Sequence, residues 1–246
     1  MDIFQNLSFD RFKELARMEG ISDAERVGFP TSYRQGKEID ILSDIFSKLS
    51  NLHMRQQNFL EIGPGSSALT DYLIQHCKDQ DHKITFVDSE EMLNLIPYAD
   101  NMTKICACFP REYEAIRSYG PYDAILIYSV LQYPFAEGNV WDFVDKACSL
   151  LAPGGQILLG DIPNISMRKR FFASEAGIKC HQEFTKKSND IPEVHFNVPE
   201  PSHMDDGFLI GLISRLRNFG FHAFLMPQTK ALPMSSRRED LLIIKP

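Results

Sequence analysis

The residues best placed for chemistry follow a short apolar run, in the stretch EIGPGSS at 61–67. An acid, Glu61, precedes two glycines, Gly63 and Gly65, and Ser67 leads into an apolar-periodic stretch. A glycine turn at the carboxyl end of a strand lets the backbone and the N-terminus of the next helix approach a ligand closely. The loop is therefore the first candidate for a cofactor site.

Two kinds of cofactor suit such a loop. Read as G-x-G-x-x-A over 63–68, it is typical of dinucleotide binding, in which backbone N–H groups hold a pyrophosphate. Asp88, about twenty residues further on, suits a ribose in either case. Glu61 distinguishes the two, because a fixed carboxylate repels a pyrophosphate and attracts the sulfonium and ammonium groups of S-adenosylmethionine. The loop therefore favours S-adenosylmethionine over NAD.

The surrounding sequence alternates between strand and helix patterns. Helices are predicted over 8–18, 38–52, 68–77, 90–96, 111–119, 140–151 and 207–218, and strands over 58–62, 83–87, 104–109, 122–128, 156–160, 221–226 and 240–245. This alternation predicts an α/β fold with a doubly wound, mostly parallel seven-stranded sheet. We expect an N-terminal helical cap at 1–52 and a cofactor-binding domain at 53–246, with a lid-like insertion at 164–203 after the fifth strand.

Four motifs occur in the order and at the separations of one enzyme family. They are EIGPG at 61–65, FVDSEEML at 86–93, YDAILIYSVLQY at 122–133 and LLAPGGQILLGD at 150–161. On these motifs the chain resembles the class I S-adenosylmethionine-dependent methyltransferases from about residue 58 to its end. The resemblance implies a Rossmann-like methyltransferase fold and a transferase that uses S-adenosylmethionine as its methyl donor.

The resemblance also implies which residues contact the cofactor. The first motif supplies Glu61, Gly63, Gly65 and Ser67. The second supplies Asp88 for the ribose hydroxyls, Ser89 beside it and Met92 against the adenine. Ser129, at the end of the fourth-strand motif, is expected beside the transferred methyl group.

Three positions extend or depart from the family pattern. Arg34, before the second long N-terminal helix, is expected to pair with the methionine carboxylate. Ser67 replaces the third glycine of the usual motif, and the stretch at 106–109 lacks the acid that often receives the adenine amino group. Adenine contacts there are therefore expected from backbone or apolar groups.

Residues for the methyl acceptor are expected near the insertion. A general base assists transfer to a hydroxyl, and three histidines lie in or beside the insertion: His181, His195 and His203. His195 is our candidate for the base, with an ordinary surface or packed histidine as the alternative for each. Asp161, after the fifth strand, and Tyr133, after the fourth, are further catalytic candidates.

The acceptor is expected to be a small polar molecule. The run Arg168-Lys169-Arg170 offers a clamp for a phosphate or carboxylate, the alternative being a charged helix face. Because bacterial methyltransferases of this build often modify surface-polysaccharide precursors, the resemblance suggests a hydroxyl of a sugar, phosphorylated sugar or nucleotide-sugar. A non-catalytic S-adenosylmethionine-binding module and an NAD-dependent oxidoreductase are the alternatives, and Glu61 disfavours the second.

Composition restricts the other partners. The net charge of −7 gives no support to nucleic-acid binding. There is no basic flank followed by an apolar region at the N-terminus, and no apolar run approaches the ~20 residues of a membrane span, so a cytoplasmic protein is expected. The five cysteines lack paired zinc-type spacing, and Ser129 stands where metal-dependent relatives carry an acid. We therefore expect no metal, and leave the oligomeric state open.

Overall fold

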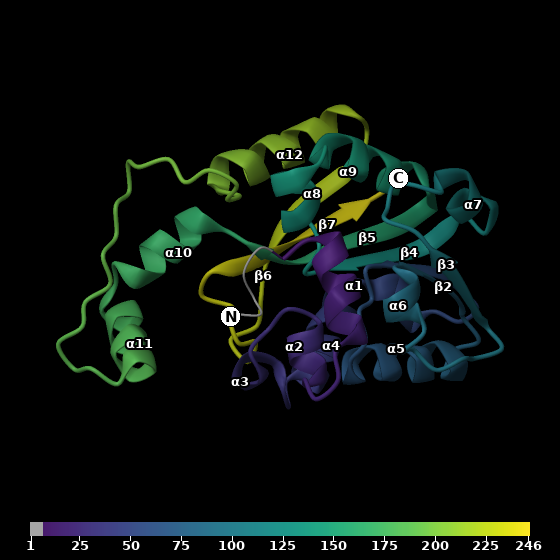
Figure 1. Cartoon of the computed structure of the whole chain (residues 1–246). Helices are drawn as coiled ribbons and strands as arrows, with labels where there is room; N and C mark the ends of the chain where they lie inside the picture. The colour runs from purple at the N-terminus through teal and green to yellow at the C-terminus, as the bar shows by residue number, and fades with distance from the viewer. Residues whose placement is uncertain (1–6) are drawn as a thin grey trace.

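The computed structural model describes residues 7–246, and these form a single mixed sheet flanked by helices (Figure 1). The first six residues of the predicted cap 1–52 lie outside the described part. Within that part the sheet has seven strands in the order β3-β2-β1-β4-β5-β7-β6. The strands are β1 (Asn58–Ile62), β2 (Lys83–Asp88), β3 (Met102–Cys106), β4 (Tyr122–Tyr128), β5 (Leu151–Pro163), β6 (His222–Pro227) and β7 (Arg238–Ile244). β7 runs antiparallel to both of its neighbours, β5 and β6. The predicted fold class is confirmed.

Helices cover both faces of the sheet. They are α1 (Phe9–Arg17), α2 (Asp23–Arg26), α3 (Thr31–Arg34), α4 (Glu38–Lys48), the 3-10 helix η1 (Ser50–His53), α5 (Ala68–Asp79), α6 (Glu90–Leu93), α7 (Tyr113–Ser118), α8 (Gln132–Glu137), α9 (Val140–Ser149), α10 (Ile165–Phe172), α11 (Glu175–Thr185) and α12 (Asp206–Asn218). One apolar cluster joins the sheet to α7, α9 and α12, and the other joins it to α4 and α5. Because both faces are covered, the central strand β4 is buried and lacks polar alternation from Ala124 to Tyr128.

The strand β1 shows how this core fixes the site. Phe59 packs into the cluster with α4 and α5, whereas Leu60 and Ile62 pack into the cluster on the other face. This alternation places Glu61 on the same face as Phe59, at the carboxyl end of the strand. The packing of the apolar neighbours on β1 therefore buries the Glu61 carboxylate.

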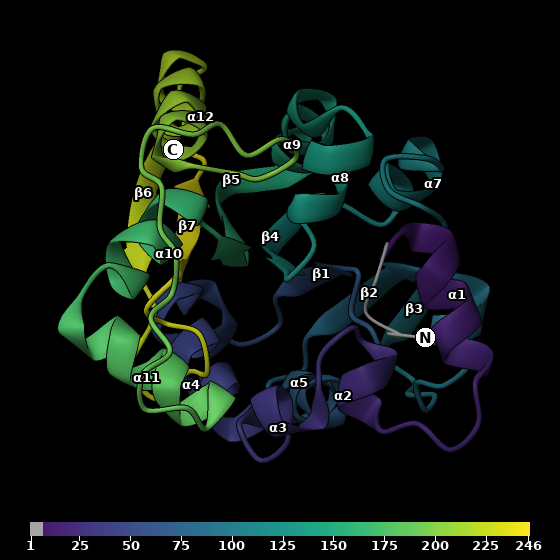
Figure 2. The ribbon, with the colours of Figure 1, turned by 60° about the vertical axis from the view of Figure 1, so that its left-hand side comes forward.

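The first N-terminal helices lie over the carboxyl ends of the strands. Ser8 caps α1, and Ser22 with Glu25 forms a capping box at α2. In Figure 2 α11 lies near α3, and the rings of Tyr33 in α3 and Phe184 in α11 are stacked with centroids 6.3 Å apart. The cap and the insertion thus meet. The division into domains at residue 52 stays a prediction.

The insertion after β5 contains two helices and an extended segment. Asn164 caps α10 and Ser174 caps α11, after which the chain runs without regular structure to α12. In Figure 1 these elements extend to the left of the sheet. That the insertion acts as a lid stays a prediction. No helix within residues 7–246 has the length and apolar character that a membrane crossing requires.

The largest differences from the predicted element boundaries are at the start of β5 and at the end of α4. β5 begins at Leu151 rather than at 156, because Leu151 pairs with Tyr122 before a register shift interrupts the ladder. The helix predicted over 38–52 ends at Lys48 and continues as η1, because the backbone at Leu49 leaves the helical region. Neither difference moves a predicted site residue.

Candidate functional site

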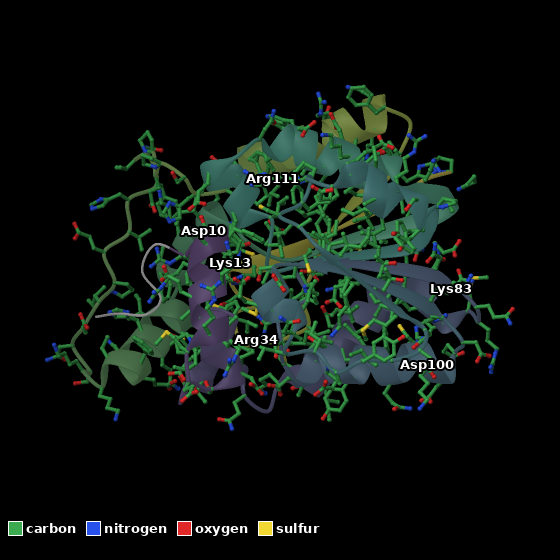
Figure 3. All side chains as sticks on the ribbon, turned by 45° about the vertical axis from the view of Figure 1, so that its right-hand side comes forward. Asp10, Lys13, Arg34, Lys83, Asp100 and Arg111 are labelled. Carbon is green, nitrogen blue, oxygen red and sulfur yellow. The ribbon has the colours of Figure 1, made fainter. Side chains whose placement is uncertain are left out.

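A cavity of about 450 Å³ lies at the carboxyl ends of β1, β2 and β4, and we call it the main cavity. The loops after these strands form one wall, and the N-terminal helices form another. Figure 3 labels Arg34 and Arg111, two lining residues contributed by α3 and by the loop after β3. Nine residues predicted from the sequence line it: Arg34, Glu61, Gly63, Gly65, Ser67, Asp88, Met92, Ser129 and Tyr133. The structure therefore brings most of the predicted site together.

Glu61 is a buried acid, and one of its two oxygens lacks a partner in the described part of the chain. Its exposed fraction is 3%, and its Oε2 atom has no hydrogen-bond partner within residues 7–246. Burial raises the pKa of Glu61 to about 8, and the neighbouring charge of Asp88 adds to the effect. A buried, unsatisfied carboxylate in a cavity is costly unless a ligand supplies a donor or a positive charge.

Asp88 is held by the loop that it faces. Its carboxylate accepts hydrogen bonds from the backbone N–H of Ser89 (2.7 Å) and of Gly65 (3.3 Å). Burial raises the pKa of Asp88 to about 6, although these two hydrogen bonds oppose the shift. Ser89 does not line the main cavity; its hydroxyl accepts a hydrogen bond from the backbone N–H of Met92 and caps α6. Ser89 therefore orients Asp88 and Met92.

Two glycines of the loop have no room for a side chain. Gly63 (φ +73°) and Gly65 (φ +63°) are in the left-handed region that favours glycine. A Cβ atom would lie 2.6 Å from the Val130 side chain at Gly63 and 2.6 Å from the Val27 side chain at Gly65. The chain needs glycine at both positions to bring its backbone along the cavity wall.

We expect Gly65→Ala to weaken cofactor binding at least tenfold, because the new methyl group displaces Val27 and the N–H group that Gly65 donates to Asp88. The matched control is Gly220→Ala. That glycine has a similar φ of +89°, but nothing lies within 4 Å of its Cβ position, and it is exposed at the end of α12. Titration calorimetry of both variants checks the prediction. An equal loss of cofactor affinity in both variants would show that general backbone strain, and not the local contacts of Gly65, causes the effect.

Ser129 and Asp161 form a linked pair at the ends of β4 and β5. Both have positive φ angles, +59° and +58°, which non-glycine residues rarely adopt. The Ser129 hydroxyl donates to the Asp161 carboxylate, and Arg238 donates to the same carboxylate at 2.9 Å. Arg34 donates to the Ser129 hydroxyl at 3.3 Å. The pair fixes the end of β4 against the cavity.

Asp161 therefore has a different place from the one expected. It does not line the main cavity, and its carboxylate is already occupied by Ser129, Arg238 and Gln228. Neighbouring Asn164 caps α10 and donates to Asp206 and Glu239. The contacts of Asp161 fit a positioning role toward Ser129. Within residues 7–246 no three His, Cys, Asp or Glu side chains are grouped to hold a metal ion.

Tyr133 lies in the wall of the cavity. Its ring meets Phe12 edge to face, with centroids 5.2 Å apart. Burial raises the pKa of the Tyr133 hydroxyl above its ordinary value. The phenol is therefore neutral at physiological pH and acts as a hydrogen-bonding group, not as an anionic base.

His195 is not brought to the main cavity. It lies on the exposed segment after α11, where its ring is 2.7 Å from the Glu193 carboxylate, and it lines a separate hollow beside α10. The predicted acceptor base thus lacks a position next to the donor loop. The reason is the path of the segment between α11 and α12, which has no pattern readable from the sequence.

Several lining residues carry no signal in the sequence. Phe9 and Phe12 of α1, Val27 after α2 and Phe29 before α3 cover the loop from the N-terminal side, and Glu137 of α8 lies on the opposite side. The amphipathic spacing of α1 is consistent with any helix packed on a core. Only the tertiary fold shows that its apolar face closes a cavity.

No protein-family model matches this sequence, and no curated protein sequence matches it. Solved structures do. The plantazolicin methyltransferase BpumL in complex with SAH superposes with a TM-score of 0.56 at 13% identity, covering 95% of each chain. The plantazolicin methyltransferase BamL, in complex with a triazolic desmethylPZN analogue and SAH, gives 0.53 at 16% identity, covering 90% of each chain.

A third similar structure is the CurJ carbon methyltransferase, with a TM-score of 0.50 at 16% identity, covering 91% of this chain and 61% of that one. The chain has the fold of these methyltransferases. At such low identity the likeness concerns the fold alone. What this methyltransferase fold does in the present chain is inferred from the residues of its own cavity.

Proposed function

We propose that the main cavity binds S-adenosylmethionine and that the protein transfers its methyl group to a small acceptor. The observation that carries the proposal is the buried Glu61 carboxylate, whose Oε2 atom has no partner within residues 7–246. A ligand with a cationic group satisfies this atom, whereas the pyrophosphate of NAD would be repelled by it. The fold shared with SAH-bound methyltransferases supports the same assignment.

The remaining cavity residues fit the other parts of S-adenosylmethionine. Asp88, at the end of β2, is the acceptor for ribose hydroxyls. Met92, Phe109 and Phe143 offer an apolar surface to the adenine. Arg34, whose side chain is 13% exposed and lies 4.0 Å from the Asp161 carboxylate, is the cation that we assign to the methionine carboxylate. Together these residues match the carboxylate, the ribose, the adenine and the two positively charged groups of S-adenosylmethionine.

Methyl transfer from a sulfonium mainly requires that the protein position the two reactants. Bound S-adenosylmethionine would supply an electrophilic methyl group on sulfur, and the acceptor would supply the lone pair and release its proton to solvent. The chain supplies an enclosed apolar site and in-line positioning. Tyr133 and Ser129 lie where the acceptor meets the donor, and Tyr133 is held as a neutral hydrogen-bonding group.

The nature of the acceptor stays a prediction. A hydroxyl of a sugar, phosphorylated sugar or nucleotide-sugar, a place in polysaccharide biosynthesis and a cytoplasmic location rest on the sequence resemblance. BpumL and BamL are named for plantazolicin, and CurJ as a carbon methyltransferase, so the shared fold does not select a sugar. The acceptor must be sought from the cavity next to the donor site.

The test is titration with S-adenosylmethionine, SAH and NAD in parallel. We expect the first two to bind and NAD not to bind. Asp88→Ala should weaken S-adenosylmethionine binding by about 10- to 100-fold, because it removes charge-assisted hydrogen bonds. Asp100→Ala is the control: Asp100 is exposed and far from the cavity (Figure 3).

Three results contradict parts of the proposal. Binding of NAD alone would mean that the loop is a dinucleotide loop after all. Unchanged affinity in Asp88→Ala would move the site elsewhere. Tight S-adenosylmethionine binding without methyl transfer to any acceptor would instead support a non-catalytic binding module.

A further inference from the structure

A second cavity, of about 420 Å³, lies beside the main cavity and we call it the side cavity. Tyr133 and Glu137 of α8 line both. The side cavity is bounded by α8, by the start of the insertion, by the segment before α12 and by the segment before β7. Tyr133 and Glu137 therefore form a wall that the two cavities share.

The lining of the side cavity is basic and apolar together. Its cationic residues are Arg168, Arg237 and Arg238, with His203 beside them, and Glu137 is the one carboxylate among the lining side chains of the described chain. The apolar part of the lining comes from Leu7, Ala136, Ile165, Met204 and Met234. This contrasts with the overall charge of −7. A local excess of arginine in an acidic protein indicates an anionic ligand.

The basic run at 168–170 does not act as one clamp. Lys169 is paired with Glu200 at 2.9 Å, and Arg170 is paired with Asp206. Successive residues of α10 point in different directions, so only Arg168 faces the side cavity. Within residues 7–246 Arg168 makes no ion pair with a carboxylate. The cation that the sequence run contributes is thus a single arginine.

Arg237 joins Arg168 from the opposite part of the sequence. The guanidinium carbons of Arg168 and Arg237 lie 5.3 and 5.6 Å from the centroid of the same ring, Phe172. In the described chain Arg237 has no carboxylate partner either, whereas Arg238 is committed to Asp161. Both guanidinium groups thus lie near one ring, and a bound anion would balance their like charges.

The electrostatics of Arg237 agree with the geometry. The side chain is partly buried, and burial lowers the pKa of its guanidinium; Tyr33 and Cys180 oppose this shift, whereas the charges of Arg238 and Arg168 add to it. Such a shift marks a cation placed where other cations and the protein interior both disfavour it. Sites of this kind are commonly binding sites, not stabilising ion pairs.

We propose that the side cavity binds the anionic group of the methyl acceptor, a carboxylate or a phosphate, through Arg168 and Arg237. The inference rests on the proposed function, because only a methyl donor in the main cavity makes a neighbouring ligand an acceptor. Guanidinium groups bind both oxyanions through paired N–H donors. The apolar lining then receives the body of the acceptor, and its nucleophilic atom lies toward Tyr133 and Glu137.

The test uses simple probes on the SAH-saturated protein. Phenyl phosphate and benzoate are the anionic probes, and benzyl alcohol and benzylamine are the neutral and cationic controls of similar size. We expect both anions to bind more tightly than either control, and the tighter of the two identifies the acceptor's anionic group. Raising the ionic strength should weaken this binding. NMR titration measures all four affinities.

Matched variants locate the binding. Arg168→Gln and Arg237→Gln should each weaken the anionic probes about tenfold, and the double variant about a hundredfold. Arg170→Gln, two residues further on the same helix but paired with Asp206, should change the affinity by less than about twofold. SAH affinity, titrated separately, should be unchanged in all of them, since none of these residues lines the main cavity.

The outcomes separate this inference from the proposed function. Equal binding of the anionic probes to wild type and the double variant, or equally tight binding of benzylamine, would overturn the anion site. Arginine-dependent anion binding by a protein that does not bind SAH would overturn the acceptor role and the methyl-transfer function together. Loss of SAH binding in the variants would also overturn the separation of the two cavities.

Discussion

Glu61→Gln should bind S-adenosylmethionine about 10- to 100-fold more weakly than wild type at pH 8. The substitution preserves the size of the side chain but removes the charge that the cationic ligand meets, and charge-assisted hydrogen bonds are the strong ones. Because Glu61 is buried at 3% exposure, little solvent screens the interaction. Titration calorimetry measures the change. Glu114→Gln, at an exposed position on α7, is the control and should bind as wild type does.

The affinity of the wild-type protein should also depend on pH. With its pKa raised to about 8, Glu61 is largely protonated at neutral pH in the free protein, and a bound cation favours the ionised form. Binding therefore releases a proton, and affinity falls as pH is lowered from 8 toward 6. Calorimetry in buffers of different ionisation enthalpy counts the protons. In Glu61→Gln the release over this range should disappear, apart from any contribution of Asp88, whose pKa is about 6.

The stability of the free protein should decrease with rising pH, whereas its affinity for S-adenosylmethionine should increase. In the unfolded chain Glu61 titrates near its ordinary pKa of about 4.3, so between that value and about 8 the folded state holds the extra proton. The free energy of unfolding therefore decreases with rising pH over this window, by up to about 1.4 kcal/mol per pH unit from this residue. Glu61→Gln should flatten the slope. If the variant kept both the wild-type affinity and the wild-type pH profile, Glu61 would not be the group that meets the cation.

The sequence was sufficient for the parts of this site that are local. Glu61 lies near the end of β1, Gly63 and Gly65 follow that strand, and Asp88 ends the next one, so parallel pairing brings them together. The glycines were assigned from their motif, and the structure explains them by the left-handed backbone and the close approach of Val27 and Val130. Short-range pattern and sheet topology determine this half of the cavity.

The other half depends on long-range packing that no motif encodes. Arg168 was visible in a basic run, but its separation from Lys169 and Arg170 depends on the partners Glu200 and Asp206. Arg237 belongs to the loop before β7 and meets Arg168 only across Phe172. Likewise the histidine that reaches a cavity beside the donor loop is His203, not His195, because the chain after α11 follows an irregular path.

Beneath the site lies a buried charge network whose sequence signal is equally weak. Lys48 of α4 lies 2.5 Å from the Asp44 carboxylate and 2.6 Å from the Asp240 carboxylate, and all three side chains are at most 4% exposed. The other oxygen of Asp240 accepts the backbone N–H of Asp161 at 2.7 Å. Burial raises the pKa of Asp240 to about 6, although Lys48 opposes the shift. The network therefore links α4 and β7 to the end of β5, where Asp161 binds Ser129.

Lys48→Met should lower the free energy of unfolding by about 3–5 kcal/mol at pH 8, because it leaves two buried carboxylates without their cation. Lys146→Met is the matched control: it breaks an i,i+4 pair with Asp142 of the same kind, but exposed, and should cost less than about 1 kcal/mol. Urea unfolding of both variants measures the difference. A similar loss in both would mean that the buried network contributes no more than a surface pair.

The loss in Lys48→Met should shrink as pH is lowered toward about 6 and then stay constant, because without the opposing charge of Lys48 the pKa of Asp240 rises above its value of about 6 and the variant takes up the proton first. Adding Asp240→Asn to Lys48→Met should recover part of the stability at pH 8 for the same reason, since the neutral amide keeps an oxygen for the Asp161 N–H. A loss independent of pH would instead indicate packing around the lysine stem. Because Asp161 holds Ser129 at the wall of the main cavity, the single variant should also bind S-adenosylmethionine more weakly than wild type at temperatures where it remains folded.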